Sequence, residues 1–173
     1  MYEFSPFQET LFLDSDTVLI EDPAFGFEMA ARHGVALSIE PDYWAQRQWA
    51  EIAPKRVTKD IPEYNTGVIF FIKHPKTQKL FERWHEIAWD YGKIHDQWSF
   101  AQAVYDTSSN PFILPPNWNF RDSMIYGPLK IWHVRDIPPP RNTERWNRGP
   151  MCLGRVEDGE IFPVAWPGAR EST

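Results

Sequence analysis

Two aspartates, two residues apart, form the part of this sequence best suited to chemistry. Asp14 and Asp16 follow the short apolar run 10–13, which is typical of a buried strand that stops at a polar edge. Ligands of open α/β sheets collect beyond the carboxyl ends of strands. Carboxylates at this spacing can share one hard cation, and oxygen ligands favour Mg²⁺ or Mn²⁺ over zinc. Because Asp also caps tight turns, the pair alone leaves a metal site and a simple turn both open.

The elements that must hold these aspartates alternate between strands and helices. The run 67–72 is continuously apolar, as in a strand covered on both faces, so we expect it to be central. Leu80, Trp84 and Ile87 recur at the spacing of an amphipathic helix over residues 75–91. Other strands are predicted at 10–13, 18–20, 35–39, 112–114 and 129–134, and other helices at about 23–33 and 96–105. Such alternation predicts an α/β layer structure with a mostly parallel or mixed sheet.

Length and composition indicate one soluble globular domain. The chain has 173 residues, of which 42% are hydrophobic, and its one cysteine, Cys152, excludes an internal disulfide and a thiolate metal cluster. The proline run 138–140 and the Gly-, Pro- and Arg-rich composition that follows predict that regular structure ends near Ile137. We therefore expect a catalytic-centre domain over residues 1–136 and a C-terminal tail over 137–173.

Charge and hydropathy exclude several classes of partner. The net charge of -6 lacks the basic surface that sequence-independent binding of nucleic acid requires. No stretch approaches the roughly 20 apolar residues that cross a bilayer, so no membrane span is expected. Residues 1–10 contain two glutamates and no basic cluster, unlike a secretory leader. These features predict a cytoplasmic protein.

Four short motifs, in the same order, resemble the GT-A family of nucleotide-diphospho-sugar glycosyltransferases, in particular its glycogenin-like and bacterial galactosyltransferase-like (family 8-like) members. They are residues 5–17 with the Asp-x-Asp pair, the segment Tyr64-Asn65-Thr66-Gly67-Val68-Ile69, the run His95-Asp96-Gln97, and the late strand Lys130-Ile131-Trp132-His133. Four ordered matches are more specific than any single one. The fold that this resemblance implies is a GT-A-like sandwich with a mixed central sheet.

The resemblance also implies roles for individual residues. Asp16 and His133 would bind Mn²⁺ or Mg²⁺, and Asp14 would bind the same ion or the donor ribose. A lone histidine in an apolar strand is, however, often only a core residue. Asn65, Thr66 and Gly67 would contact substrate, and Asp96 and Gln97 would bind donor-sugar hydroxyls beside the anomeric carbon. Asp96 could equally serve only to begin a helix. Trp118 is the best candidate to stack on an acceptor sugar, with Trp44 and Trp49 as weaker ones.

The implied activity is metal-dependent transfer of a hexose from a nucleoside-diphosphate sugar to the hydroxyl of a glycan or another acceptor. The sequence departs from the family at its start, because family members place a nucleotide-binding βαβ unit of more than about 30 residues before the Asp-x-Asp strand. Here that strand begins near residue 10, so we expect a chain truncated at its N-terminus. Two alternatives stay open: a non-catalytic remnant that keeps glycan or metal binding, and a metal-dependent phosphoesterase.

Overall fold

A computed structural model describes residues 1–40, 62–90, 96–134, 137–150 and 152–164. The chain forms two compact units, the first made of residues 1–14 and 23–115 and the second of residues 15–22 and 116–173. Trp44, Trp49 and His95, which entered the sequence predictions, lie outside the described residues, as does Tyr91 at the end of the predicted helix 75–91.

The first unit is built on a mixed four-stranded sheet in the order β1-β4-β3-β5. β4 pairs antiparallel with β1 and with β3, and β5 runs parallel to β3. The strands are β1 (Glu9–Leu13), β3 (Val35–Ile39), β4 (Tyr64–Ile72) and β5 (Phe112–Leu114), and the helices are α1 (Ala24–His33), α3 (Pro75–Asp90) and α4 (Asp96–Thr107). The predicted central strand and the helices that follow it are therefore confirmed.

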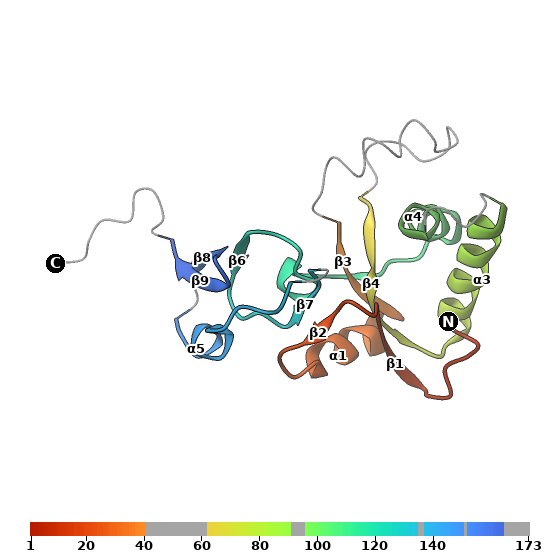
Figure 1. Ribbon diagram of the computed structural model, residues 1–173. Coiled ribbons are helices and arrows are strands. Elements are labelled where there is room, and N and C mark those ends of the chain that lie inside the picture. Colours follow the sequence, from red (N-terminus) through yellow and green to blue (C-terminus); the bar gives the residue numbers. More distant parts are fainter. Residues whose placement is uncertain (41–61, 91–95, 135–136, 151, 165–173) are drawn as a thin grey trace. The chain divides into compact units, whose positions relative to one another are not determined.

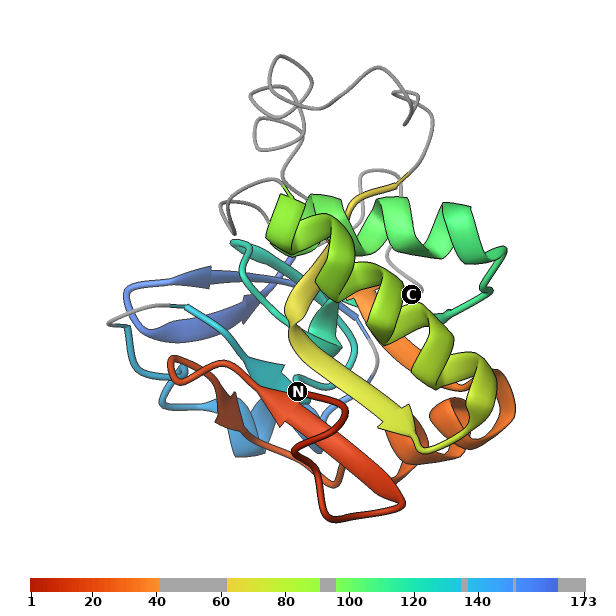
Figure 2. The same cartoon turned by 90° about the vertical axis from the view of Figure 1, so that its right-hand side faces the viewer.

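Helices cover both faces of this sheet. Neighbouring residues of a strand point to opposite faces, so Phe70 and Phe71 of β4 contact different layers. The ring of Phe70 lies 5.2 Å from that of Phe27 in α1, and the ring of Phe71 lies 5.0 Å from that of Phe81 in α3. Helix α1 thus packs on one face while α3, with α4 beside it, packs on the other (Figure 1 and Figure 2). The predicted α/β layer structure is confirmed, with a mixed sheet.

Strand β1 is less buried than the sequence predicts. Among the described residues it pairs with β4 alone, at one edge of the sheet. All its residues after Glu9 are half-buried, whereas those of β4 from Tyr64 to Phe71 are fully buried. The apolar run correctly indicated a strand, but an edge position leaves one side without a neighbour and so exposes part of each side chain.

A close approach of backbone to core fixes helix α1 on the sheet. At Gly26, a Cβ atom would lie 2.5 Å from two ring atoms of Phe70, which is itself fully buried. That separation is too short for any real contact, so the helix can lie this close to the sheet only because glycine has no side chain.

Gly26→Ala is therefore expected to lower the free energy of unfolding by about 1–3 kcal/mol, because the added methyl group must displace a buried ring. Urea denaturation followed by circular dichroism measures it. Ala31, exposed on the same helix, supplies the control, since Ala31→Val adds volume facing solvent and should cost only the small loss of helix propensity. A Gly26→Ala protein as stable as the wild type would contradict this packing.

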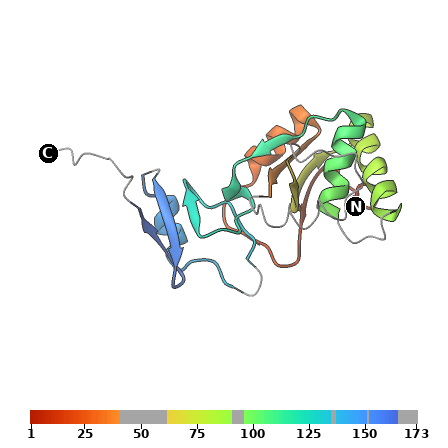
Figure 3. The same cartoon turned by 90° about the horizontal axis from the view of Figure 1, so that it is seen from above.

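The second unit consists of short strands around a small core. β2 (Val18–Leu19) pairs with β7 (Ile131–Trp132), and β6 (Met124–Tyr126), β8 (Leu153–Glu157) and β9 (Glu160–Pro163) form an antiparallel sheet. A 3₁₀ turn, η1 (Pro116–Trp118), precedes β6, and helix α5 (Thr143–Asn147) lies against the β8–β9 hairpin (Figure 3). The core contains Phe120, Ile125, Leu129, Trp132 and Ile161.

The prediction that regular structure ends near Ile137 is wrong, since α5, β8 and β9 all follow that residue. The sequence signal for the β8–β9 hairpin is the dipeptide Asp158-Gly159, which joins the two strands with φ values of 51° and 74°. Positive φ at both central residues is the geometry of a type I′ hairpin turn, and Asp-Gly is among its preferred sequences. The surrounding glycines, prolines and arginines concealed this turn. The domain boundary at residue 136 stays a prediction.

Candidate functional site

The first aspartate is held by pairing of the sheet. Leu13 at the end of β1 lies opposite Val68 of β4, so the next residue, Asp14, lies opposite Gly67. The Asp14 N–H donates to the Gly67 carbonyl at 2.8 Å, which extends the ladder by one residue. Asp14 therefore directly follows a strand, as the apolar run 10–13 predicts, and the sheet pairing places its backbone beside the segment 65–67.

The segment 65–67 is buried and makes side-chain hydrogen bonds in two directions. The Asn65 Nδ2 group donates to the Glu40 carboxylate at 2.8 Å, and Asn65 Oδ1 accepts from the Gly67 N–H at 3.0 Å. The Thr66 hydroxyl donates to Asp96 Oδ2 at 2.6 Å. Because successive side chains of a strand alternate, Asn65 and Thr66 reach different partners. Sequence motifs 30 residues apart thus meet within the first unit.

Asp96 is the first residue of α4, where the positive end of the helix dipole stabilises a carboxylate. Its main-chain carbonyl accepts from the Trp84 indole N–H at 2.8 Å, which ties the start of α4 to α3. Its carboxylate accepts from Thr66 and is exposed to solvent. Gln97, the next residue, is partly buried. Asp96 begins a helix and also presents an exposed carboxylate, so both uses of this residue that the sequence suggested are compatible with its position.

The second aspartate contacts His133 within the second unit. Asp16 Oδ1 lies 3.1 Å from His133 Nε2, although the two residues are 117 positions apart. His133 directly follows β7 and is 6% exposed, whereas the Asp16 side chain is 36% exposed. The His133 N–H donates to the Phe120 carbonyl at 2.9 Å, which fixes the backbone from which the ring extends. His133 is buried, as a core histidine would be, yet one of its ring nitrogens faces a carboxylate.

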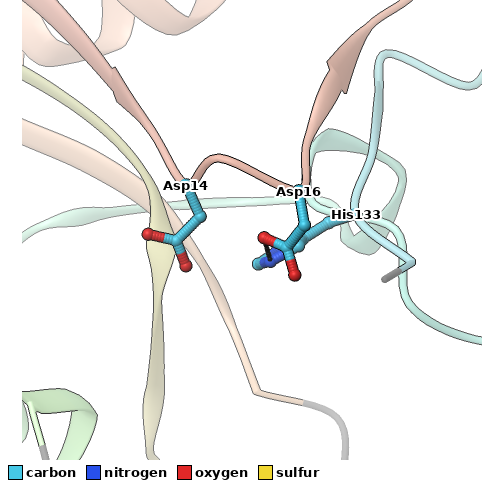
Figure 4. A group of neighbouring side chains, drawn as sticks. All are labelled: Asp14, Asp16 and His133. Atoms are coloured by element: carbon cyan, nitrogen blue, oxygen red, sulfur yellow. Dashed lines mark hydrogen bonds and ion pairs between the residues drawn. The ribbon is translucent and has the colours of Figure 1, made fainter. Parts of the chain in front are cut away.

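Asp14, Asp16 and His133 form a group with the composition of a metal site (Figure 4). One ligand atom from each lies within 4.8 Å of the other two. Two atoms bound at about 2.0–2.4 Å to one ion are at most about 4.8 Å apart, so this spacing suits a shared cation. Carboxylate oxygens suit Mn²⁺ and Mg²⁺, and a neutral imidazole is a common nitrogen ligand of metals in proteins. The residues present therefore fit the predicted Mn²⁺ or Mg²⁺.

Trp118 lies in η1 and is only 5% exposed. The Lys130 ammonium lies 5.9 Å from the centre of its ring. A ring so covered offers little area to a sugar, which argues against the predicted stacking role of Trp118.

Two polar residues beside the predicted site were not proposed from the sequence. Glu40, at the end of β3, is 4% exposed and receives the Asn65 amide. An acidic residue directly after a buried strand was the available signal. Asn119 is 3% exposed, and its Oδ1 lies 2.7 Å from His133 Nδ1. No local spacing links residues 119 and 133, so only the fold could show this contact.

Comparison with known proteins identifies the class. The family model described as nucleotide-diphospho-sugar transferase matches residues 8–130, and the chain belongs to that family. The fold is similar to the crystal structure of the galactosyltransferase LgtC in complex with donor and acceptor sugar analogues, with a TM-score of 0.50 and 15% sequence identity. The match covers 83% of this chain and 59% of LgtC. No curated protein matches the chain. The predicted GT-A-like fold and family are thus confirmed.

The part of the chain that the structure describes contains no helix long and apolar enough to span a membrane.

Proposed function

We propose that this chain is a metal-dependent glycosyltransferase, or the catalytic-centre part of one, that transfers a hexose from a nucleoside-diphosphate sugar to an acceptor hydroxyl. The observation that carries the proposal is the contact between Asp16 and His133 in a chain of the nucleotide-diphospho-sugar transferase family. Asp16 follows Asp14 by two positions, and all three residues offer metal ligands. A turn-capping role would account for the aspartates but not for a buried imidazole 3.1 Å from one of them.

Asp14, Asp16 and His133 would hold one Mn²⁺ or Mg²⁺ ion. The bound cation would supply charge to the diphosphate oxygens of the donor and so stabilise the leaving group. Two contacts support this role. The Asp14 backbone is held by its hydrogen bond to Gly67, and Asp16 Oδ1 lies 3.1 Å from His133 Nε2. Neither carboxylate is fully buried, so a ligand can reach both.

The donor sugar would bind at the edge formed by segment 65–67 and the start of α4. Thr66 occupies one acceptor position of the Asp96 carboxylate, and the remaining lone pairs of that group suit sugar hydroxyls. The Asn65 amide donates to Glu40 and accepts from the Gly67 N–H, so it is fixed in one orientation. Gln97 would add an amide donor beside Asp96. Burial raises the pKa of the neighbouring Tyr64 hydroxyl above its ordinary value, which is already well above physiological pH, so this hydroxyl is neutral.

The acceptor is proposed to be a glycan or another hydroxyl compound. The acidic chain, with its net charge of -6, is not expected to bind nucleic acid, and we propose a cytoplasmic location for it.

Release of nucleoside diphosphate from a panel of nucleotide sugars tests the proposal. We expect release that requires Mn²⁺ or Mg²⁺, stops with EDTA and returns when Mn²⁺ is added in excess. Cation-dependent release of inorganic phosphate from phosphate esters, without attack on nucleotide sugars, would instead indicate a phosphoesterase. Binding of Mn²⁺ or glycan without any turnover would indicate a non-catalytic remnant, and either result would overturn the proposed activity.

A further inference from the structure

Asn119 lies directly behind the imidazole of His133. Its Oδ1 is 2.7 Å from His133 Nδ1, and the opposite ring nitrogen, Nε2, is 3.1 Å from Asp16 Oδ1. The backbone sets this arrangement, because the Phe120 N–H donates to the Ile131 carbonyl and the His133 N–H donates to the Phe120 carbonyl, each at 2.9 Å. All of these residues belong to the second unit. Asn119 and His133 are both more than nine-tenths buried, so the contact is shielded from water.

We infer that Asn119 is a positioning residue of the proposed metal site, an inference that rests on the proposed function. An amide oxygen can only accept a hydrogen bond, so its contact with His133 requires the proton to be on Nδ1. An imidazole that binds a metal is neutral and carries one N–H, so Nε2 is then the nitrogen whose lone pair is available on the Asp16 side. Two acceptors 3.1 Å apart repel unless a positive charge lies with them, and a cation bound to both relieves that repulsion. Asn119 thus prepares Nε2, and not Nδ1, as the ligand.

The other half of the amide supports this role. Asn119 Nδ2 is buried and has no hydrogen-bond partner among the described residues. The carbonyl oxygen, which contacts His133, is therefore the polar atom of this side chain for which the structure shows a hydrogen bond. Asn119→Asp keeps an oxygen acceptor and replaces the unpartnered amino group with the second oxygen of a carboxylate, whereas Asn119→Leu keeps the approximate volume and removes the acceptor.

Titration of the full chain with Mn²⁺, followed by calorimetry, tests the inference. We expect Asn119→Leu to bind Mn²⁺ about 10- to 100-fold more weakly than the wild type, the usual effect of removing the partner behind a histidine ligand. Asn119→Asp should bind at least as tightly as the wild type, because a carboxylate behind the ring increases its basicity. Asn117 supplies the matched control: it is also buried and its amide donates to the Pro128 carbonyl, away from His133. Asn117→Leu should lower the thermal unfolding temperature and leave Mn²⁺ affinity within about threefold.

A spectroscopic signature separates positioning from general stability. In electron spin-echo spectra, Mn²⁺ bound by the wild type should show modulation from a directly coordinated ¹⁴N nucleus. The modulation should be lost in His133→Gln, strongly reduced in Asn119→Leu and retained in Asn119→Asp and Asn117→Leu. If Asn119→Leu does not fold, Asn119→Ala is judged by the same two measurements.

The outcomes distinguish the inference from the proposed function. If Asp16→Asn and His133→Gln weaken Mn²⁺ binding but loss of the Asn119 acceptor changes neither affinity nor ¹⁴N modulation, the inference is wrong and the metal site stands. If Asp16→Asn and His133→Gln themselves leave Mn²⁺ binding unchanged, the proposed function and the inference both fail.

Discussion

Asp16→Ala is expected to weaken Mn²⁺ binding by at least about 100-fold and to reduce cation-dependent turnover to background. Loss of a residue that only supports a metal ligand costs up to about 100-fold in affinity, so loss of a direct ligand should cost at least as much. Asp16 supplies one of two carboxylates in the group and is the one in contact with His133. Without it, Asp14 and a neutral imidazole are left as the protein's donors, and the charge on the bound cation is less well balanced. Calorimetric titration gives the affinity, and nucleoside diphosphate release gives the turnover.

The control for this change is Asp122→Ala. Asp122 is an exposed carboxylate of the second unit whose hydrogen bonds are made to the adjacent Ser123. Its removal alters the net charge by the same amount, so it should leave Mn²⁺ affinity unchanged within about twofold. An Asp16→Ala protein that binds Mn²⁺ like Asp122→Ala would show that the cation binds elsewhere.

Asp96→Ala is expected to lower kcat/KM for the donor by about 100-fold, the scale of a misplaced substrate, while Mn²⁺ affinity stays within about twofold of the wild type. Its proposed partners are sugar hydroxyls; its carboxylate accepts a hydrogen bond from Thr66, and its main-chain carbonyl accepts one from Trp84. Because its carboxylate is exposed, removing it should not disturb the core. Steady-state kinetics with varied donor, beside a Mn²⁺ titration, separates the two effects.

Thr66→Val is the companion change. It keeps the shape of a buried side chain and removes the hydroxyl that lies 2.6 Å from Asp96. We expect a loss of about 10-fold in kcat/KM, because the variant loses one hydrogen bond to a charged group while the carboxylate itself remains.

An Asp96→Ala variant as active as the wild type would show that Asp96 does not bind the donor sugar. That result would not affect the proposed metal site.

Much of the first unit could be predicted from sequence because its signals are local and strong. The continuous apolar run in β4 identified a central strand, and the spacing of Leu80, Trp84 and Ile87 identified α3. Edge exposure of β1 could not be predicted, because it depends on which strands pair and not on the strand's own residues. In the second unit the hairpin at Asp158-Gly159 was predictable in principle, but a composition rich in glycine and proline suggested a tail.

The candidate site divides along the same line. Asp14 and Asp16 were apparent from position, since both follow an apolar strand. Thr66 and Asp96 came from motifs, and the structure joins them by one hydrogen bond. Asn119 could not be identified from the sequence, because its contact with His133 depends on backbone hydrogen bonds between residue 120 and residues 131 and 133. Contacts between residues far apart in the sequence produce no periodic pattern from which they could be predicted.

Anomalous X-ray diffraction decides whether Asp14, Asp16 and His133 bind one cation. The crystals contain the full chain with Mn²⁺ and a nucleoside diphosphate and are measured at the manganese absorption edge. We expect one strong anomalous peak in contact with carboxylate oxygens of Asp14 and Asp16 and with Nε2 of His133, at about 2.0–2.4 Å from each. A map with no peak at these three residues, or with manganese bound only elsewhere on the chain, would contradict it.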